Sequence, residues 1–457
     1  MVSLLWTLGI WAVALLIIAR GNLHELVYRK QSGWAIERIA MVLVLLGSFT
    51  NAARASADEV LADPVVLERV IRGGLAGIAL LFVLPAVFRG IRSTPLRAAP
   101  GLTALWFYAL VGGVSILYSV APIVTGPKAI ELAAGLVIIT SLALSDNARG
   151  NLRQAIRFVV ALDAALIGTA VLGFFVVPST FASVQFRPGF ILAKTMTSPW
   201  ASSNNLSTSG SVVAAFALAS FFESETRRQK AGWIVLFLSG TAGTLLASGR
   251  QGIAMWMAAT GLLLWFHRRH LFILMIGPAT AAMVYLNWDS VLTILARNQS
   301  QESLALLTGR LRFWEAAVES WIQHPFTGYG FGAGGRFVAL ASIGEGTRSN
   351  LHSGYLEALL GVGLLGLIPL TYALIRALRW SFHNLRSRID TDLAILIVPL
   401  ALHTAVDLGF GAWLKPDFLI LAGIVALADH ELRGRRTLDF HDSQAPRVPR
   451  GQLAGRQ

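Results

Sequence analysis

The chain has 457 residues, of which 55% are hydrophobic and 14% are charged, and its formal net charge is +13. Soluble chains carry about 25% charged residues, so this composition excludes an ordinary soluble enzyme. Many of the Lys and Arg residues stand in short loops between apolar runs, where cations orient membrane helices. The positive charge therefore does not indicate nucleic-acid binding. The lack of cysteines excludes disulfides, thiol nucleophiles and cysteine-ligated metals.

Apolar segments of about the length that crosses a bilayer recur along most of the chain. The sequence predicts an all-α polytopic membrane protein with about 12–13 transmembrane helices. Residues 1–430 are expected to form one transmembrane domain, and residues 431–457 a basic cytoplasmic tail that is disordered. The apolar segments lie near residues 3–19, 39–53, 70–88, 101–121, 128–145, 157–176, 208–223, 231–248, 252–266, 271–287, 354–375, 392–408 and 416–429.

Cations separate the two sides of the predicted bundle. Loops such as "RGIRSTPLR", "NARGNLRQAIR", "HRRH" and "RALRWSFHNLRSR" all fall on one side when every apolar segment crosses the membrane. The positive-inside rule makes that side cytoplasmic. The opposite side holds residues 54–69, residues 177–207 and an external loop at about 288–353, which is longer than a plain connection needs.

The external loop carries a predicted amphipathic helix. In "RLRFWEAAVESWIQHP" apolar residues recur at helical spacing, and we expect this helix to lie on the outer membrane surface. The following "HPFTGYGFGAGG" predicts a Pro/Gly loop, whose glycines could also form a nest of backbone amides for an anion. The apolar positions of the helix are Leu311, Trp314, Ala317, Val318 and Trp321.

Two arginines stand on the side where the positive-inside rule disfavours cations. Arg250 lies in "LLASGRQGIAMW" between two apolar segments, and Arg310 opens the amphipathic helix. An arginine in such a place can simply extend its side chain to lipid headgroups. Two outer-face arginines far apart in sequence also suit one anionic ligand, because guanidinium forks match phosphate oxygens.

A histidine, His352, lies at the end of the external loop, just before the apolar run "GYLEALLGVGLLG". A lone histidine at a helix start can be a capping or interface residue. Imidazole nevertheless titrates near neutral pH, so this side chain can accept a proton from a hydroxyl group. Ser349 and Asn350 precede it and are good N-cap types, and a helix start here would present backbone amides to an anion.

Further ionisable side chains in or beside the apolar segments are candidates for supporting roles. His403 and Asp407 are spaced i, i+4 on one face of the twelfth segment. A structural hydrogen-bonded pair is the favoured interpretation, and a role beside the acceptor stays open. The other candidates are Arg72, Arg312 and Arg348, which could add to an anion site, and Asp163 and Glu131, which lie inside apolar segments.

No metal site is predicted. The "DTD" of residues 390–392 is similar to the metal-binding motif of nucleotide-sugar glycosyltransferases. It stands at a predicted cytoplasmic helix start, where Asp and Thr are common as caps and suit the helix dipole. Oxygen-ligand metal sites need more convergent carboxylates than this motif supplies, so capping is the favoured interpretation.

Three motifs together resemble the bacterial O-antigen ligase and polysaccharide polymerase superfamily. They are "SGR" at 248–250, "TGRLRFWEAAVESWIQHPFTGYGFG" at 308–332 and "LHSGYLEALLGVGLLG" at 351–366. The family shows an arginine shortly before a tryptophan, then P-x-x-G-x-G, then a histidine ahead of a Y-L-x-x-L-x-x-x-G-x-x-G helix. Ser353 stands where the family usually has asparagine. The matching positions are Arg310, Trp314, Pro325, Gly328, Gly330, His352, Tyr355, Leu356, Gly363 and Gly366.

The resemblance implies a membrane glycosyltransferase of surface polysaccharide biosynthesis, in lipopolysaccharide or exopolysaccharide. The donor would be a glycan linked to polyprenyl (undecaprenyl) diphosphate, and the acceptor a glycan or lipid A-core. The resemblance implies that Arg250 and Arg310 bind the diphosphate and that His352 assists the acceptor hydroxyl. It places the protein in the bacterial inner membrane with its site facing the periplasm, without a nucleotide sugar, cofactor or metal.

Two other classes stay open at the level of sequence. A transporter or flippase of lipid-linked glycans could use Asp163, Glu131 and the His403/Asp407 pair as a proton path. No inverted repeat or matched pair of broken helices supports that interpretation. A pure assembly scaffold gives no reason for arginines on the outer face. Ligase and polymerase also stay unseparated, because the sequence does not reveal the acceptor pocket.

Overall fold

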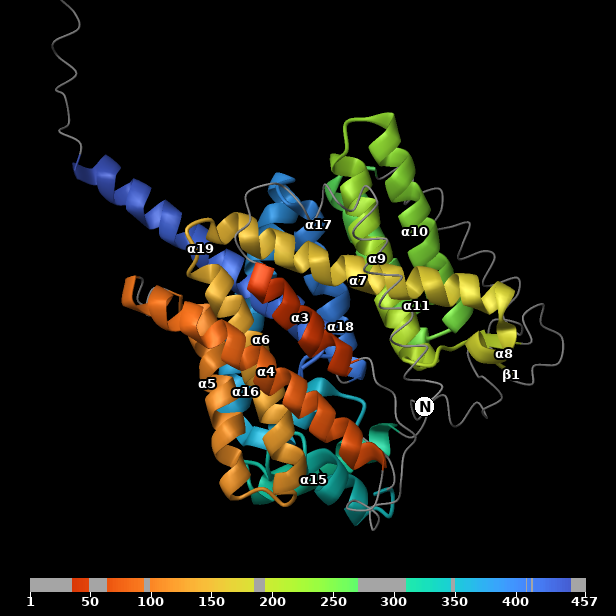
Figure 1. Ribbon diagram of the computed structural model, residues 1–457, viewed down its shortest axis with the longest axis vertical. Helices are drawn as coiled ribbons and strands as arrows, with labels where there is room; N and C mark the ends of the chain where they lie inside the picture. The colour runs from red at the N-terminus through yellow and green to blue at the C-terminus, as the bar shows by residue number, and fades with distance from the viewer. Residues whose placement is uncertain are drawn as a thin grey trace, which may run out of the picture.

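The computed structural model describes residues 35–48, 64–93, 99–184, 194–269, 310–346, 350–407, 409–411 and 414–444. In these ranges the chain is almost entirely helical (Figure 1). A short antiparallel hairpin pairs β1 (Ala182–Val184) with β2 (Lys194–Met196). The helices are α3 (Ala35–Ser48), α4 (Pro64–Ser93), α5 (Pro100–Val114), η3 (Ser115–Leu117), α6 (Pro122–Ala143), α7 (Ala148–Val176), α8 (Pro178–Phe181), α9 (Ser203–Glu223), α10 (Arg227–Ala247), α11 (Arg250–Phe266), α15 (Arg310–Gln323), η5 (Gly335–Leu340), α16 (Gly354–Ser387), α17 (Thr391–Ala394), α18 (Ile397–Val406) and α19 (Pro416–Gln444).

The prediction of an all-α polytopic membrane protein is confirmed. Among the described residues, six helices are long and apolar enough to cross a bilayer. Two predicted segments, near 3–19 and 271–287, lie outside the described residues. Each of the others overlaps a helix, except that the segment near 392–408 is divided between α17 and α18. The six helices are Pro100–Leu117, Pro122–Ala143, Ala148–Val176, Ser203–Glu223, Arg227–Ala247 and Gly354–Ser387.

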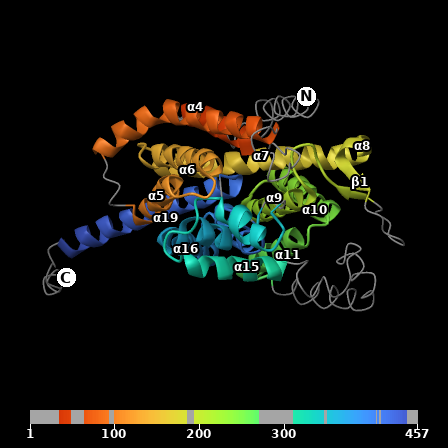
Figure 2. The same cartoon turned by 90° about the horizontal axis from the view of Figure 1, so that it is seen from below.

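The first half of α19 is the centre of the bundle. Every residue from Asp417 to Asp429 is buried, as expected for a helix that is apolar on all sides and surrounded by other helices. It contacts α5, α6, α7, α16 and α18. Helix α4 covers the far side of α6, together with α3 (Figure 2). Helices α9, α10 and α11 pack on one another, and α11 also contacts α18.

Helix α16 is broken in its first third. Gly363 has φ 60° and ψ −161°, a region of backbone conformation that is essentially restricted to glycine. The loop at 325–330 lies against the break and supplies the hydrogen bonds that the helix loses. The amides of Tyr329 and Gly330 donate to the carbonyls of Leu360 and Gly361 at 2.8 and 2.9 Å.

The helix also donates a hydrogen bond to the loop. Beyond the break, the Leu364 amide donates to the Pro325 carbonyl at 2.9 Å. Non-helical backbone at membrane depth is tolerated only where protein or water satisfies it. Both glycine-rich motifs therefore have one structural cause, which is the close pairing of a loop with a broken helix.

The basic segment that begins α7 contacts the connection between α16 and α17, next to the end of α9. Arg153, near the start of α7, pairs with Asp390, and Arg157 Nη2 lies 2.7 Å from Asp392 Oδ2. The Thr391 amide donates to Glu223, at the end of α9, at 2.6 Å. We call this region the basic end. Asp390 thus stands at the N-cap position of α17, but its side chain makes no capping hydrogen bond there. The two acids of "DTD" pair with arginines of α7 instead.

The predicted tail begins as helix. We expected residues 431–457 to be disordered, but α19 continues to Gln444. The segment "ELRGRRTLDF" contains Glu, Leu and Arg, which are strong helix formers and can extend a helix that has already begun. Residues 445–457 lie outside the described residues.

Replacing Gly363 with alanine tests the broken helix. A Cβ atom there would lie 2.3 Å from the Phe326 carbonyl carbon, at a φ that alanine disfavours. We expect Gly363→Ala to lower the free energy of unfolding by about 3 kcal/mol or more, seen as a lower melting midpoint in detergent. Gly232→Ala is the control, because no heavy atom lies within 4 Å of a Cβ at this position in α10. Equal melting midpoints for the two variants would contradict the strain at Gly363.

Candidate functional site

The segment that carries His352 is held by α15 and α16. Trp314 Nε1 of α15 donates to the Leu351 carbonyl at 3.0 Å. The Leu351 amide donates to the buried carboxylate of Glu357, in the first turn of α16, at 2.8 Å. Ser353 caps α16 by accepting from the Leu356 amide. The motif tryptophan therefore positions the histidine segment from the neighbouring helix.

His352 itself adopts a left-handed backbone conformation with φ 55°, which is costly for a residue with a side chain. Its amide donates to Asn350 Oδ1 at 2.9 Å, closing a local turn. Unusual backbone geometry of this kind is often found at functional sites. The imidazole is 27% exposed, so the ring is held by protein yet reachable from outside.

Asp407 faces the histidine ring. Its Oδ1 lies 3.6 Å from His352 Nδ1, which is within ion-pair range but longer than a hydrogen bond. Its other oxygen, Oδ2, accepts from Gln251 Nε2 of α11 at 2.9 Å. The Asp407 carbonyl accepts from the Gly354 amide at 2.7 Å. This one residue therefore links the end of α18 to α11 and to the start of α16.

Arg310 reaches the same place from α15. Its Nη1 donates to the Val406 carbonyl at 2.5 Å, one residue before Asp407. Burial lowers the pKa of Arg310, and the Asp407 carboxylate opposes that shift. Arginine stays protonated at any physiological pH. A half-buried guanidinium therefore lies beside the histidine and its carboxylate.

Arg250 is brought to this end of the bundle by a tight turn between α10 and α11. Ser248 is left-handed with φ 53°, and Gly249 packs so closely on α9 that a Cβ would lie 2.5 Å from Ser207 Cβ. Ser207 Oγ also donates to the Gly249 carbonyl at 3.1 Å. Arg250 is the first residue of α11, directly before the Gln251 that contacts Asp407.

The structure thus gathers segments that are far apart in sequence around Asp407. His352 and Arg310 lie next to it, and Arg250 precedes a residue that contacts it. Arg250 and Arg310 are the first residues of α11 and α15, and His352 lies two residues before the start of α16. A guanidinium group, an imidazole and a carboxylate in one place can bind an anion and accept a proton, and Arg250 at the start of α11 is the next cation along the chain from this contact.

The other candidate residues lie elsewhere or have different partners. Arg312 is exposed and its Nη2 donates to the Ile343 carbonyl at 3.3 Å. His403 does not form the hydrogen-bonded pair with Asp407 that the sequence favoured. Its Nδ1 instead forms a hydrogen bond with Asp417 Oδ2 of α19 at 2.6 Å. The Arg72 side chain and the whole of Arg348 lie outside the described residues.

The Gly-rich loop and the predicted amphipathic helix both have partners in the structure. The amides of Tyr329 and Gly330 bond to α16 and that of Phe331 donates to Ser115 Oγ, so these three are not free to form a nest for an anion. The predicted helix is present as α15. Val318 is 42% exposed, whereas the helix packs on η5 and α16 and its buried residues are Phe313, Ala316, Ala317 and Ser320.

Sequence reasoning missed Gln251 and Glu357. Gln251 is a polar residue in an apolar segment and directly follows Arg250, so its position in the sequence could have marked it as a site candidate. Glu357 stands three residues into the apolar α16 run, where an ionisable residue usually has a specific role. Asp417 was also missed, although "LKPDF" puts a carboxylate at the start of a buried helix.

Part of the chain that carries these residues matches a known protein family. Residues 231–371 match the model of a protein family described as O-antigen ligase, Wzy_C. The match runs from α10 into α16 and includes Arg250, Arg310 and His352, whereas Asp407 lies beyond it. A comparison with curated proteins finds no match to the chain. The family match confirms the resemblance drawn from the sequence motifs.

Trp314→Phe tests how the histidine segment is held. The variant keeps an aromatic ring but loses the hydrogen bond to the Leu351 carbonyl, a loss of about 1 kcal/mol. We expect faster amide hydrogen exchange at residues 350–354, measured by mass spectrometry. Trp321→Phe is the matched control, because it removes an equivalent 3.0 Å bond to the Pro325 carbonyl on the other side of the loop. Identical exchange at 350–354 in both variants would contradict the assigned role of Trp314.

Proposed function

Because residues 231–371 match the O-antigen ligase family, we propose that this membrane protein is a glycosyltransferase acting on lipid-linked glycans. The family match supports a glycan-ligating role at a membrane. The proposal specifies the donor as a glycan on polyprenyl diphosphate, such as undecaprenyl diphosphate. The acceptor is a hydroxyl of another glycan or of lipid A-core.

One observation carries the proposal. Arg310 and His352, which come from separate parts of the external loop, lie beside the same residue, Asp407. Binding of a diphosphate leaving group needs cations, and activation of a hydroxyl needs a base. The two needs must be met within a few ångströms of each other, and the geometry around Asp407 satisfies this requirement.

The proposed reaction is a direct displacement. The acceptor oxygen attacks the anomeric carbon of the donor sugar, and the bond from that carbon to the diphosphate oxygen breaks. The proton of the acceptor hydroxyl passes to the imidazole of His352. Polyprenyl diphosphate leaves, and the guanidinium groups of Arg310 and Arg250 stabilise the charge that grows on it.

Asp407 is a positioning residue in this mechanism. Its carboxylate faces His352 Nδ1, so it orients the ring and stabilises the imidazolium that forms when the proton is taken. The remaining ring nitrogen, Nε2, is then the one that meets the acceptor. The 3.6 Å separation suits a site without substrate, where catalytic contacts are often longer than in the reacting complex.

The proposed location follows from charge. The basic end of the bundle carries many more cations than the end with the His352 site, and the positive-inside rule assigns it to the cytoplasm. The His352 site then faces the periplasm, in a bacterial inner membrane. The arginines of the site remain on the disfavoured side because they bind substrate.

Arg310→Lys tests the diphosphate role. Lysine keeps the positive charge but loses the planar fork that fits phosphate oxygens, so we expect glycan transfer to fall about 100-fold. The assay uses purified protein in nanodiscs with a polyprenyl-diphosphate-linked glycan. Arg312→Lys is the matched control two residues away, because Arg312 is exposed and donates to the Ile343 carbonyl rather than to the Asp407 region. Equal transfer by both variants would remove Arg310 from the site.

His352→Ala tests proton transfer and separates the possible activities. We expect a loss of about 100- to 10,000-fold with the protein still monodisperse. With donor alone, a ladder of products made by the wild type and lost in the variant indicates a polymerase. Product that appears only when lipid A-core is added indicates a ligase. Donor that crosses the membrane without any transfer would replace the proposal with the transporter alternative.

A further inference from the structure

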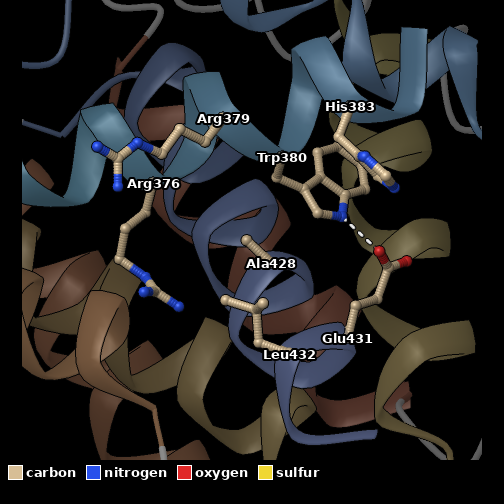
Figure 3. Close-up of a pocket in the computed structure, with 7 residues that line it drawn as sticks. All are labelled: Arg376, Arg379, Trp380, His383, Ala428, Glu431 and Leu432. Atoms are coloured by element: carbon tan, nitrogen blue, oxygen red, sulfur yellow. Dashed lines mark hydrogen bonds between the residues drawn. The ribbon is translucent and has the colours of Figure 1, made fainter. Parts of the chain in front are cut away.

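A cavity of about 260 Å³ lies between the C-terminal part of α16 and α19 (Figure 3). It is separate from the His352 site, and no step of the proposed reaction uses it. Its lining combines cationic, aromatic and apolar side chains. The lining residues are Arg376, Arg379, Trp380, His383, Ala428, Glu431 and Leu432.

The position of the cavity along α16 places it near a membrane surface. Helix α16 begins at Gly354, beside the His352 site, and Arg379 lies far along the same helix. A rise of about 1.5 Å per residue separates the two by roughly 35 Å. This is close to the thickness of a bilayer hydrocarbon core, about 30 Å. The cavity therefore lies at the headgroup level of the leaflet opposite the His352 site.

Most of the charges around the cavity are already neutralised within the protein. Arg376 donates to Asp429 through Nε at 3.0 Å and Nη2 at 2.5 Å. Glu431 accepts from Trp380 Nε1 at 2.8 Å and from Arg149 Nη2 at 3.0 Å. These contacts join α16, α19 and α7, and they leave neither carboxylate available to neutralise a further cation.

The charge of Arg379 is not neutralised in this way. Its side chain is exposed, and it makes no hydrogen bond or ion pair with the residues that the structure describes. His383 follows one turn later on α16 and is also exposed at the cavity. Arg379 therefore adds a guanidinium group without a partner among the described residues to one side of the cavity, and His383 lines the other side, beyond Trp380 (Figure 3).

The lining fits one class of ligand. A guanidinium fork suits the oxygens of a phosphate group. An indole at this level is typical of the membrane interface, and Ala428 and Leu432 offer apolar contact to the start of an acyl chain. Basic pockets between membrane helices at this surface bind anionic lipid headgroups. We propose that the cavity binds the phosphodiester headgroup of an anionic phospholipid such as phosphatidylglycerol.

A bound lipid would contact two helices, α16 and α19, that also extend towards the His352 end of the bundle. It would bridge α16, whose first turn follows His352, and α19, whose first turn carries the Asp417 that bonds to His403. The lipid would therefore favour the packed arrangement of α16 and α19. The proposal does not depend on which glycan reaction the His352 site performs.

The test measures lipid retention on purified full-length protein by native mass spectrometry, with phosphatidylglycerol and phosphatidylcholine of matched chains as the probes. We expect the wild type to retain phosphatidylglycerol about five-fold better and to melt at a higher temperature with it. Arg379→Gln combined with His383→Gln should abolish this preference. Arg379→Lys should keep most of it, because the charge remains.

Arg386→Gln is the matched control, because Arg386 is exposed on the same helix but does not line the cavity. It should behave as the wild type. Equal retention of both lipids by the wild type would overturn the proposal, as would full preference in the double variant or an equal loss in the control. Stabilisation by millimolar inorganic phosphate without lipid would show a site for soluble phosphate instead.

Discussion

The contacts of Asp407 are the interaction on which the candidate site depends. The residue ends α18 in an extended conformation. From there its side chain and backbone contact α11, His352 and the start of α16, and Arg310 of α15 donates to the preceding Val406 carbonyl. A carboxylate in such a place needs partners, because an unpaired buried charge is very costly. Its partners are Gln251 and the ring of His352, with the guanidinium group of Arg310 close by. The electrostatic need of one buried acid thus brings together an imidazole and a guanidinium group from segments widely separated in sequence.

The pairing of the 325–330 loop with the broken α16 provides the frame for that assembly. The loop follows α15, and the break lies two to three turns after His352, so the pairing fixes α15 and the start of α16 relative to each other. Main-chain hydrogen bonds have a defined geometry and do not depend on side-chain rotamers. They therefore hold Arg310 and His352 in register more rigidly than apolar packing alone would. The glycines of the two motifs are present because no other residue lets the two backbones approach so closely.

The sequence predicted the helices well and the contacts between them only in part. Apolar length and cation patterning are local properties, so they located most helices and the basic end. His352, Arg310 and Arg250 stood out because a cation or imidazole is unusual in their surroundings. The partners of Asp407 could not be predicted, because helical spacing favoured His403, which in the structure bonds to Asp417. Which residues face each other across helices depends on packing that no periodicity reveals.

The break in α16 also has a consequence for the order in which the chain can be assembled in a membrane. The loop that pairs with it is synthesised first, and its amides have no helical partner until α16 has entered the bilayer. In lipid such groups cannot remain unpaired, so the loop has to wait in water. Asp407 emerges later still, from α18. The contacts around Asp407 can therefore form only after α15, α16 and α18 have all been synthesised, late in the assembly of the described helices.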